Sequence, residues 1–308
     1  MSDTCLPVST TAPRPAILEK WTQPALILLF CLLWSSAFTA AKIGIVDAPP
    51  LLLLGFRFLI AGVALTAVML VLRGPQSIRR DEIGRLVLLG LLNHALYLGL
   101  GYLGMRTISS GLAAVIMSTS PIITTALAAM MLGERFTLRK GLGLLLGLAG
   151  VAFILRSRLT VGHDDLGGML FGICAAIGLS AGTILYKKLP TRSDSFAGLG
   201  VQLIAAGSGL LPIALLLEDV SAIHPTWSLL GALLYLVGPI SVGAYTLWFM
   251  LLRRGSATQA SSLHFIMPPL GLLMGWAVLA EPLNAIDFLG ILPVAFGIWL
   301  VTRSPKTA

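Results

Sequence analysis

Charge is scarce in this chain. Of its 308 residues, 11% are charged and 56% are hydrophobic, whereas globular domains carry about 25% charged residues. The mean hydropathy is +0.92. These values exclude a soluble globular domain and indicate a membrane protein.

Cysteine is also scarce, with three residues in all. Cys5 lies near the N-terminus, Cys31 and Cys174 lie within apolar stretches, and the sequence has no CxxC motif or Cys/His cluster. This pattern predicts neither a disulfide framework nor a metal site. The phosphate-loop motif GxxxxGK[ST] is missing too, so we expect no ATP-driven activity and no cofactor.

Ten long apolar stretches occupy most of the chain. A membrane-spanning helix needs about 20 apolar residues, and polar, proline and glycine residues divide the sequence into ten segments near that length. The first span is too long for a cleavable signal peptide and has no small-residue cleavage site. We expect an all-α polytopic membrane protein with spans at 25–46, 50–72, 84–104, 109–131, 138–156, 167–187, 195–217, 227–250, 257–279 and 285–302.

The net charge is +8, and the basic residues are unequally distributed between the two sides of the predicted spans. Four basic residues fall on the side opposite the N-terminus, and Arg57 falls inside a span. Basic residues concentrate in cytoplasmic segments of membrane proteins, so both termini are expected in the cytoplasm and no nucleic acid is expected as a partner. Sixteen of the 21 basic residues fall on the side of the N-terminus: Arg14, Lys20, Arg73, Arg79, Arg80, Arg85, Arg135, Arg139, Lys140, Lys187, Lys188, Arg192, Arg253, Arg254, Arg303 and Lys306.

The sequence repeats itself once. Residues 111–121 read GLAAVIMSTSP and residues 258–268 read TQASSLHFIMP, and a glutamate, Glu134 or Glu281, follows each final proline by thirteen residues. Each half holds five spans, so the second half enters the membrane from the opposite face. The expected fold is therefore ten transmembrane helices in a 5+5 inverted repeat, an arrangement typical of transporters with a substrate site between the halves.

The repeat and the composition together predict the domain boundaries. A Ser/Thr/Pro-rich stretch over 1–20 is expected to be a disordered cytoplasmic tail. The first repeat is expected over 21–158, the second over 159–303, and a short cytoplasmic tail over 304–308.

Several segments resemble the EamA repeat of the drug/metabolite transporter superfamily. They are residues 33–42 (LWSSAFTAAK), 54–58 (LGFRF), 111–121 and 132–150 (LGERFTLRKGLGLLLGLAG), and the second half follows the pattern more loosely. The resemblance covers residues 25–302. It implies a central cavity and a metabolite or amino-acid exporter of the bacterial inner membrane, similar to the branch that includes YddG-like proteins. The implied partners are a small-molecule substrate and the lipid bilayer. The oligomeric state is left open, and a monomer is compatible with this architecture.

Polar groups within spans are costly and usually face protein or water, so they are the candidate cavity residues. His94 lies near the middle of the third span, with Tyr97 and Tyr102 following it on the same helix. They are expected to line a cavity that hydrogen-bonds a small zwitterion. The alternative is a neutral histidine satisfied by a neighbouring helix.

Aromatic residues in other spans are further candidates. Trp34 lies too deep in the first span for an interfacial position, so it is expected either at the cavity wall or in helix packing. Tyr245 and His264 are cavity candidates in the eighth and ninth spans, whereas Trp248 and Tyr186 are expected at the membrane interface.

Prolines interrupt the fourth and ninth spans at equivalent places. Pro121 follows Ser118, a candidate donor to substrate, and Pro268 follows His264. Irregular backbone within a membrane is tolerated only where it is buried in protein or lines a cavity. Pro121 and Pro268 are expected either to act as hinges or to be ordinary kinks solvated by Ser and Thr hydroxyls.

Two kinds of charged residue are expected to be structural. Arg57 lies in the second span and either holds a substrate carboxylate or, as the favoured interpretation, snorkels outward or caps a helix end. Glu134 and Glu281 stand at helix-to-helix turns, where a carboxylate suits the positive end of the next helix.

The leading functional hypothesis is an alternating-access exporter of small metabolites, mainly amino acids. A sugar-phosphate or nucleotide-sugar antiporter is the alternative within transport, but it would need a cluster of basic residues at mid-membrane. Residues 178–182 match GxSxG, but they lie inside a spanning helix and not at a strand-to-helix turn, so an intramembrane hydrolase is disfavoured.

Overall fold

The computed structural model describes residues 16–104, 107, 116–155, 165–279 and 289–302. Within these ranges the chain is helical and contains no strand. Seven helical stretches are long and apolar enough to cross a membrane, and three shorter ones complete a set of ten. The ten expected spans are thus confirmed, with five helical segments in each half.

The first half begins with two long helices, α1 (Ala16–Asp47) and α2 (Pro50–Arg73). The third span joins α3 (Ile83–Gly90), a π-helical segment (Leu91–Leu96) and α4 (Tyr97–Gly104). The described part of the fourth span ends in α6 (Ser120–Leu132), and α7 (Leu138–Leu155) is the fifth.

The second half follows the same plan. Its first two helices are α8 (Leu166–Lys188) and α9 (Ser195–Leu217). The eighth span joins α10 (Trp227–Tyr235), a π-helical segment (Leu236–Ala244) and α11 (Tyr245–Arg254). The ninth joins α12 (Ala257–Ser262), a 3₁₀ turn (Leu263–Ile266) and α13 (Met267–Leu279), and α14 (Ile291–Thr302) is the tenth.

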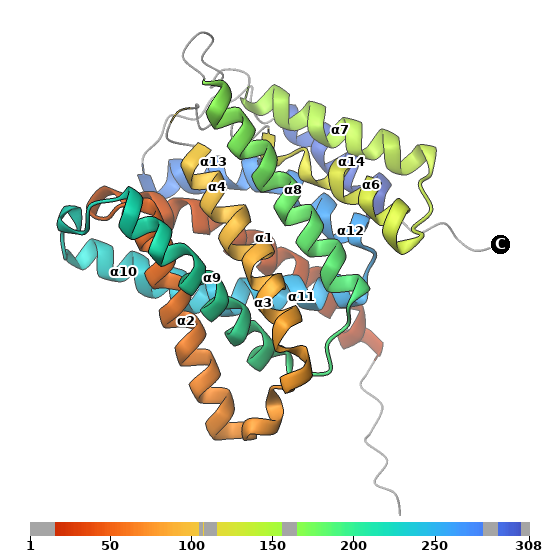
Figure 1. The fold of residues 1–308 in the computed structure, drawn as a ribbon. Coiled ribbons are helices and arrows are strands. Elements are labelled where there is room, and N and C mark those ends of the chain that lie inside the picture. Colours follow the sequence, from red (N-terminus) through yellow and green to blue (C-terminus); the bar gives the residue numbers. More distant parts are fainter. Residues whose placement is uncertain (1–15, 105–106, 108–115, 156–164, 280–288, 303–308) are drawn as a thin grey trace, which may run out of the picture.

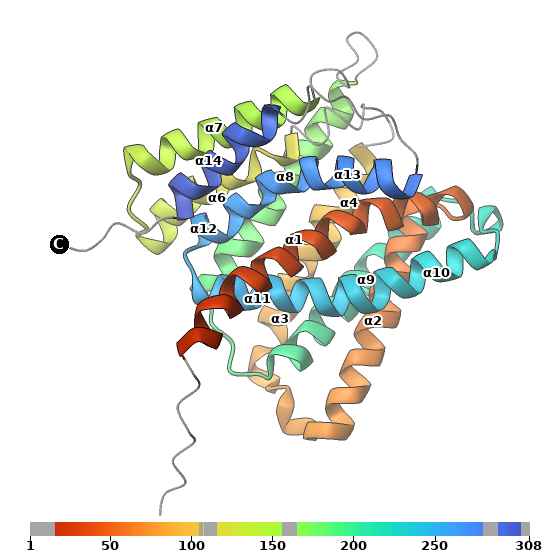
Figure 2. The ribbon, with the colours of Figure 1, turned by 180° about the vertical axis from the view of Figure 1, so that it is seen from behind.

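The two halves pack against each other helix by helix. Helix α2 lies along α9, and α7 lies along α14, as both ribbon views show (Figures 1 and 2). Helix α1 packs on α10 and α13, while α8 packs on α4 and α6. Each half therefore supplies equivalent helices to an interface at the centre of the molecule.

Glycines allow the closest of these approaches. A Cβ atom added to Gly143 would lie 2.7 Å from the Gly297 carbonyl oxygen, and one added to Gly62 would lie 2.9 Å from the Gly200 carbonyl oxygen. Small residues let membrane helices approach closely in this way. Gly143 of α7 and Gly62 of α2 therefore lie at close contacts between the halves.

The two π-helical segments occupy corresponding spans of the two halves. The paired prolines, Pro121 and Pro268, are 147 residues apart, and so are His94 in the first π segment and Ser241 in the second. A π turn widens the helix locally and is found frequently at functional sites. The internal repeat thus extends to a shared irregularity of the backbone.

The N-terminal boundary differs from the sequence-based expectation. Helix α1 begins at Ala16, inside the stretch 1–20 that was expected to be a disordered tail. Residues 16–20 read AILEK and are mostly good helix formers, which explains the earlier start. Residues 1–15 and 303–308 lie outside the described part of the chain.

The distribution of basic residues predicts which loops face the cytoplasm. Single cysteines at Gln76→Cys and Ala222→Cys occupy exposed positions in loops that are expected on opposite faces. In intact cells an impermeant thiol reagent should label the second variant but not the first, in a background with Cys5, Cys31 and Cys174 replaced. Labelling of the Gln76→Cys variant alone would reverse the predicted orientation.

Candidate functional site

Aromatic rings from both halves meet at the centre of the molecule. Trp34 of α1 lies 5.0 Å from Tyr245 of α11 and 5.7 Å from His264 of the ninth span, measured between ring centroids. His94 of the third span lies 4.3 Å from Tyr245 in a T-shaped arrangement. Four of the predicted cavity residues therefore form one cluster, called here the aromatic cluster together with Phe30 and Trp248.

Trp248 corrects one expectation. The sequence places it near the end of the eighth span and predicts a position at the membrane interface. In the structure it is 1% exposed, stacks on Phe30 at 5.6 Å and lies 4.9 Å from His264. The ninth span covers this end of α11, so a tryptophan near the helix end is still enclosed by protein.

Tyr186 is likewise enclosed, although an interfacial position was expected. It is 9% exposed, stacks on Phe249 at 4.3 Å and accepts a hydrogen bond from Arg253 Nε at 2.9 Å. The contact ties α8 to α11 at one end of the helices.

The two histidines of the aromatic cluster have unused hydrogen-bonding atoms. His94 is fully buried, and neither of its ring nitrogens has a hydrogen-bond partner among the described residues. His264 Nδ1 lies 3.0 Å from the Ser261 carbonyl oxygen, while its Nε2 has no partner within the same part of the chain. Buried polar groups are normally satisfied, so unused ones mark a site where a ligand can bind.

Tyr97, Tyr102 and Ser118 are the remaining predicted cavity residues. Tyr97 is 6% exposed and begins α4, three residues after His94 of the cluster. Tyr102 is partly buried and lies one or two turns further along the same span. Ser118 is buried at the turn before α6.

Arg57 is a further residue at the centre, where the sequence favoured a snorkelling or capping role. It is 3% exposed, and its Nε donates a hydrogen bond to Ser241 Oγ at 2.8 Å. Ser241 lies in the second π segment and was not a predicted site residue. Its position, 147 residues after His94, is the signal in the sequence that identifies it.

The helix breaks predicted at the prolines are present in both halves. In the fourth span a turn at Ser118 and Thr119 precedes α6, and Pro121 is the second residue of that helix. In the ninth span a 3₁₀ turn precedes α13, and Pro268 is its second residue. The Ile116 carbonyl at this turn accepts two hydrogen bonds, from Thr119 N at 3.0 Å and from Thr119 Oγ1 at 2.6 Å.

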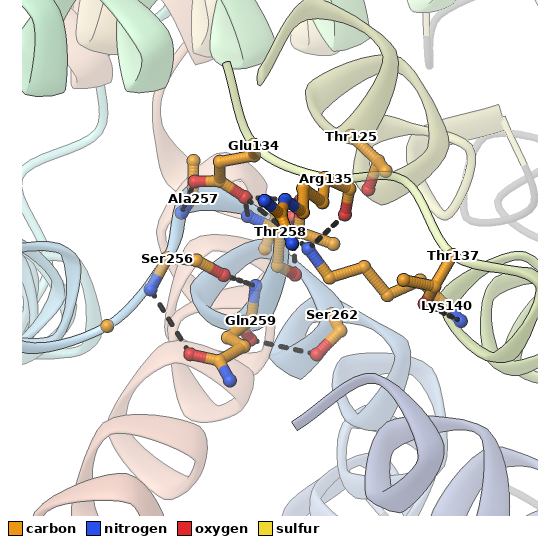
Figure 3. Close-up of polar contacts among 12 residues, drawn as sticks. Thr125, Glu134, Arg135, Thr137, Lys140, Ser256, Ala257, Thr258, Gln259 and Ser262 are labelled. Carbon is orange, nitrogen blue, oxygen red and sulfur yellow. Dashed lines mark hydrogen bonds and ion pairs between the residues drawn. The ribbon is translucent and has the colours of Figure 1, made fainter. Parts of the chain in front are cut away.

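Glu134 acts on a helix other than the one expected. Its carboxylate accepts hydrogen bonds from Ala257 N at 2.7 Å and from Thr258 N and Oγ1 at 3.4 and 2.8 Å, so it caps α12 of the opposite half (Figure 3). The sequence predicted that it would serve α7, which follows it. The free N–H groups at a helix start attract carboxylates from any neighbouring segment, and the fold brings α12 closest. Glu281, the equivalent residue of the second half, lies outside the described residues.

Ser180 of the GxSxG match has no catalytic arrangement. It is fully buried within α8, and its one hydroxyl hydrogen is shared between the Ala176 and Ser120 carbonyl oxygens, which lie 2.8 and 3.1 Å from Oγ. These partners are backbone carbonyl groups and not a base that could remove the proton. Among the described residues no group of three or more His, Cys, Asp and Glu could hold a metal ion.

An open pocket of about 510 Å³ lies away from the aromatic cluster. It is found at the end of α1 and is lined by Lys42, Ile43, Ile45, Val46, Asp47 and Ser228. None of the predicted cavity residues contributes to it. The cluster itself is closely packed in this conformation.

Ten membrane-spanning segments, a repeated half and buried polar groups at the centre define a polytopic membrane transporter. The model of the EamA-like transporter family matches residues 23–156 and again 166–303. The chain belongs to this family, and it has the ten-helix, 5+5 inverted-repeat fold. The family and its relatives are transporters rather than enzymes.

Related proteins match almost the whole chain. The transporter YvbV of Bacillus subtilis is 30% identical, over 92% of this chain and 93% of its own. The transporter YoaV of the same organism is 29% identical, over 90% and 95%. A probable amino-acid metabolite efflux pump of Salmonella typhimurium is 28% identical, over 89% and 93%. One solved structure covers 90% of this chain and 95% of its own, with a TM-score of 0.76 and 19% identity, and it shows the shared fold.

The cap between Glu134 and α12 should contribute measurably to stability. Glu134→Ala leaves two buried N–H groups and the Thr258 hydroxyl without their acceptor, which should cost about 1–3 kcal/mol. We expect a lower midpoint of thermal unfolding for the purified protein in detergent. Asp81→Ala is the matched control, because an exposed pair such as Asp81 with Arg79 contributes about 0–1 kcal/mol. Equal midpoints for the two variants would contradict the capping role.

Proposed function

We propose that this transporter exports small metabolites, most of all amino acids, across the bacterial inner membrane. The observation that supports it is the meeting of the aromatic cluster, from both halves, around histidine nitrogens that have no partner in the described part of the chain. The proposed transport activity, its outward direction and the inner-membrane location are consistent with the names of relatives. These include a probable amino-acid metabolite efflux pump and an inner membrane transporter, YedA of Escherichia coli.

The proposed substrate site is formed by Trp34, His94, Tyr97, Tyr245 and His264. Aromatic faces attract the ammonium group of an amino acid and cover its apolar side chain. Imidazole nitrogens and tyrosine hydroxyls supply hydrogen bonds without adding charge. Tyr102, further along the third span, and Ser118, at the turn of the fourth, are proposed to contact substrate on its way to or from this site.

The proposed mechanism is alternating access by the two halves. Because the halves are inverted copies, the state open to one face is close to the mirror image of the state open to the other. The breaks before Pro121 and Pro268 are proposed as paired hinges, since each lacks continuous α-helical hydrogen bonding.

A sugar-phosphate or nucleotide-sugar antiporter remains the alternative substrate class. Such a substrate carries two or more negative charges and would need several basic side chains at the centre. In the part of the chain described, Arg57 is the one buried arginine or lysine. A single basic group suits a monocarboxylate better than a phosphorylated sugar.

Substitution at the aromatic cluster should reduce transport without loss of fold. In proteoliposomes containing a panel of labelled amino acids, with and without a pH gradient, His94→Ala and Tyr97→Ala should each lower the rate about tenfold or more, because each removes a hydrogen-bonding group from the site. His94→Gln should be milder than His94→Leu if hydrogen bonding is what the ring supplies. Wild-type rates in both alanine variants, at equal thermal stability, would remove these residues from the site.

The proposed hinges predict opposite effects in the two halves. Pro121→Ala and Pro268→Ala restore a backbone donor at each break and should each slow turnover more than they weaken substrate binding. Because the halves are inverted, one variant should favour the state open to the cytoplasm and the other the opposite state. Accessibility of cysteines on the two faces measures this bias. A shift in the same direction, or none, would show that the prolines only kink their helices.

A further inference from the structure

Arg57 carries a buried charge that no described acidic residue balances. The ion pairs of the described residues join Arg73 to Asp194, Arg79 to Asp81 and Lys140 to Glu134, and none of them includes Arg57. Its position seven residues into α2 places it about 10 Å along the helix from its start. An unpaired charge at such a place is costly, and ionisable residues within membranes mark functional sites.

One hydrogen bond holds the guanidinium in place. Ser241 Oγ donates its own hydrogen to the Leu236 carbonyl at 2.8 Å, so its oxygen faces Arg57 as an acceptor and receives the Nε–H at 2.8 Å. A guanidinium has five N–H donors. The other four, on Nη1 and Nη2, have no hydrogen-bond partner among the described residues.

Ring contacts place the guanidinium beside the aromatic cluster. Its Cζ lies 5.1 Å from the centroid of the Phe58 ring, and that ring lies 5.7 Å from His94, measured between ring centroids. Ser241, its hydrogen-bond partner, precedes Tyr245 by four residues, and Tyr245 lies 5.0 Å from Trp34. The free end of Arg57 therefore adjoins the proposed substrate site.

We propose that Arg57 binds the carboxylate of the transported molecule through Nη1 and Nη2, and that Ser241 is its positioning residue. The proposal rests on the proposed function and names the substrate class of that site as monocarboxylates. The two terminal nitrogens of arginine match the two oxygens of a carboxylate in a paired, charge-assisted contact. A decarboxylated amine would meet an unbalanced positive charge and is excluded.

Binding of simple analogues tests the site without any transport. The probes are 4-methylpentanoate, its amide, 3-methylbutylamine and inorganic phosphate, added to purified protein in detergent while thermal unfolding is followed. The carboxylate should stabilise the wild type with an apparent affinity about tenfold or more above that of the amide, because a charge-assisted contact is lost in the amide. The amine should give no stabilisation. Equal responses to carboxylate and amide, or a response to phosphate in place of the carboxylate, would overturn the proposal.

Variants of Arg57 and Ser241 test whether these two residues cause the preference for carboxylate over amide. Arg57→Gln should abolish the preference for carboxylate over amide, and Arg57→Lys should retain part of it, since lysine keeps the charge but not the paired geometry. Ser241→Ala should reduce the preference and Ser241→Thr should restore it. Arg253→Gln is the matched control, because Arg253 bonds Tyr186 at one end of α11. A preference unchanged in Arg57→Gln would refute the site, and if that variant does not fold, Arg57→Lys and the wild-type analogue series decide.

Amino-acid flux in proteoliposomes separates this inference from the proposed function. If the wild type carries no amino acid while its carboxylate preference depends on Arg57, the function is wrong and the Arg57 site is supported. If the wild type and Arg57→Gln carry amino acids equally well, the function is supported and the Arg57 site is wrong.

Discussion

Backbone hydrogen bonding inside a bilayer is the constraint on which this structure depends. Lipid offers no partner to an N–H or C=O group, so each departure from a continuous α-helix needs an internal partner. In the fourth span the Thr119 hydroxyl adds a hydrogen bond to the Ile116 carbonyl at the turn, and in the second π segment the Ser241 hydroxyl bonds the Leu236 carbonyl. At the start of α12 the acceptor is Glu134 from the opposite half. Side chains that satisfy the backbone thus also place the irregular segments at the interface between the halves.

The same constraint explains why the centre is polar yet almost uncharged. Histidine, tyrosine and serine supply hydrogen-bonding groups there without a net charge, whereas a charged group requires a counter-ion. Arg57 is the exception at this centre, with one neutral hydrogen-bond acceptor, Ser241. An anionic ligand would lower the free energy of this arrangement. Binding of such a ligand would also neutralise the unfavourable charge of Arg57.

Much of the fold follows from the sequence because bilayer thickness sets helix length. The expected span 195–217 coincides with α9, and 50–72 differs from α2 by one residue. The sequence also selected Trp34, His94, Tyr245 and His264, because polar and aromatic residues deep in a span have few other places to lie. It missed the burial of Trp248 and the target of Glu134, since both depend on which distant helix packs alongside. Ser241 could be found only by comparing the two halves position by position.

That comparison extends to Arg57. Lys42 and Lys187 are 145 residues apart, as are Arg57 and Gln202, and Gln202 is also buried, with its Oε1 unpartnered in the described part of the chain. The two copies therefore share a backbone but present a cation on one side of the axis and a neutral amide on the other. A ligand held between them meets two unlike walls and has one preferred orientation. Duplication supplied a symmetric scaffold for two alternating conformations. Divergence at a few buried positions made its two halves chemically different toward a ligand.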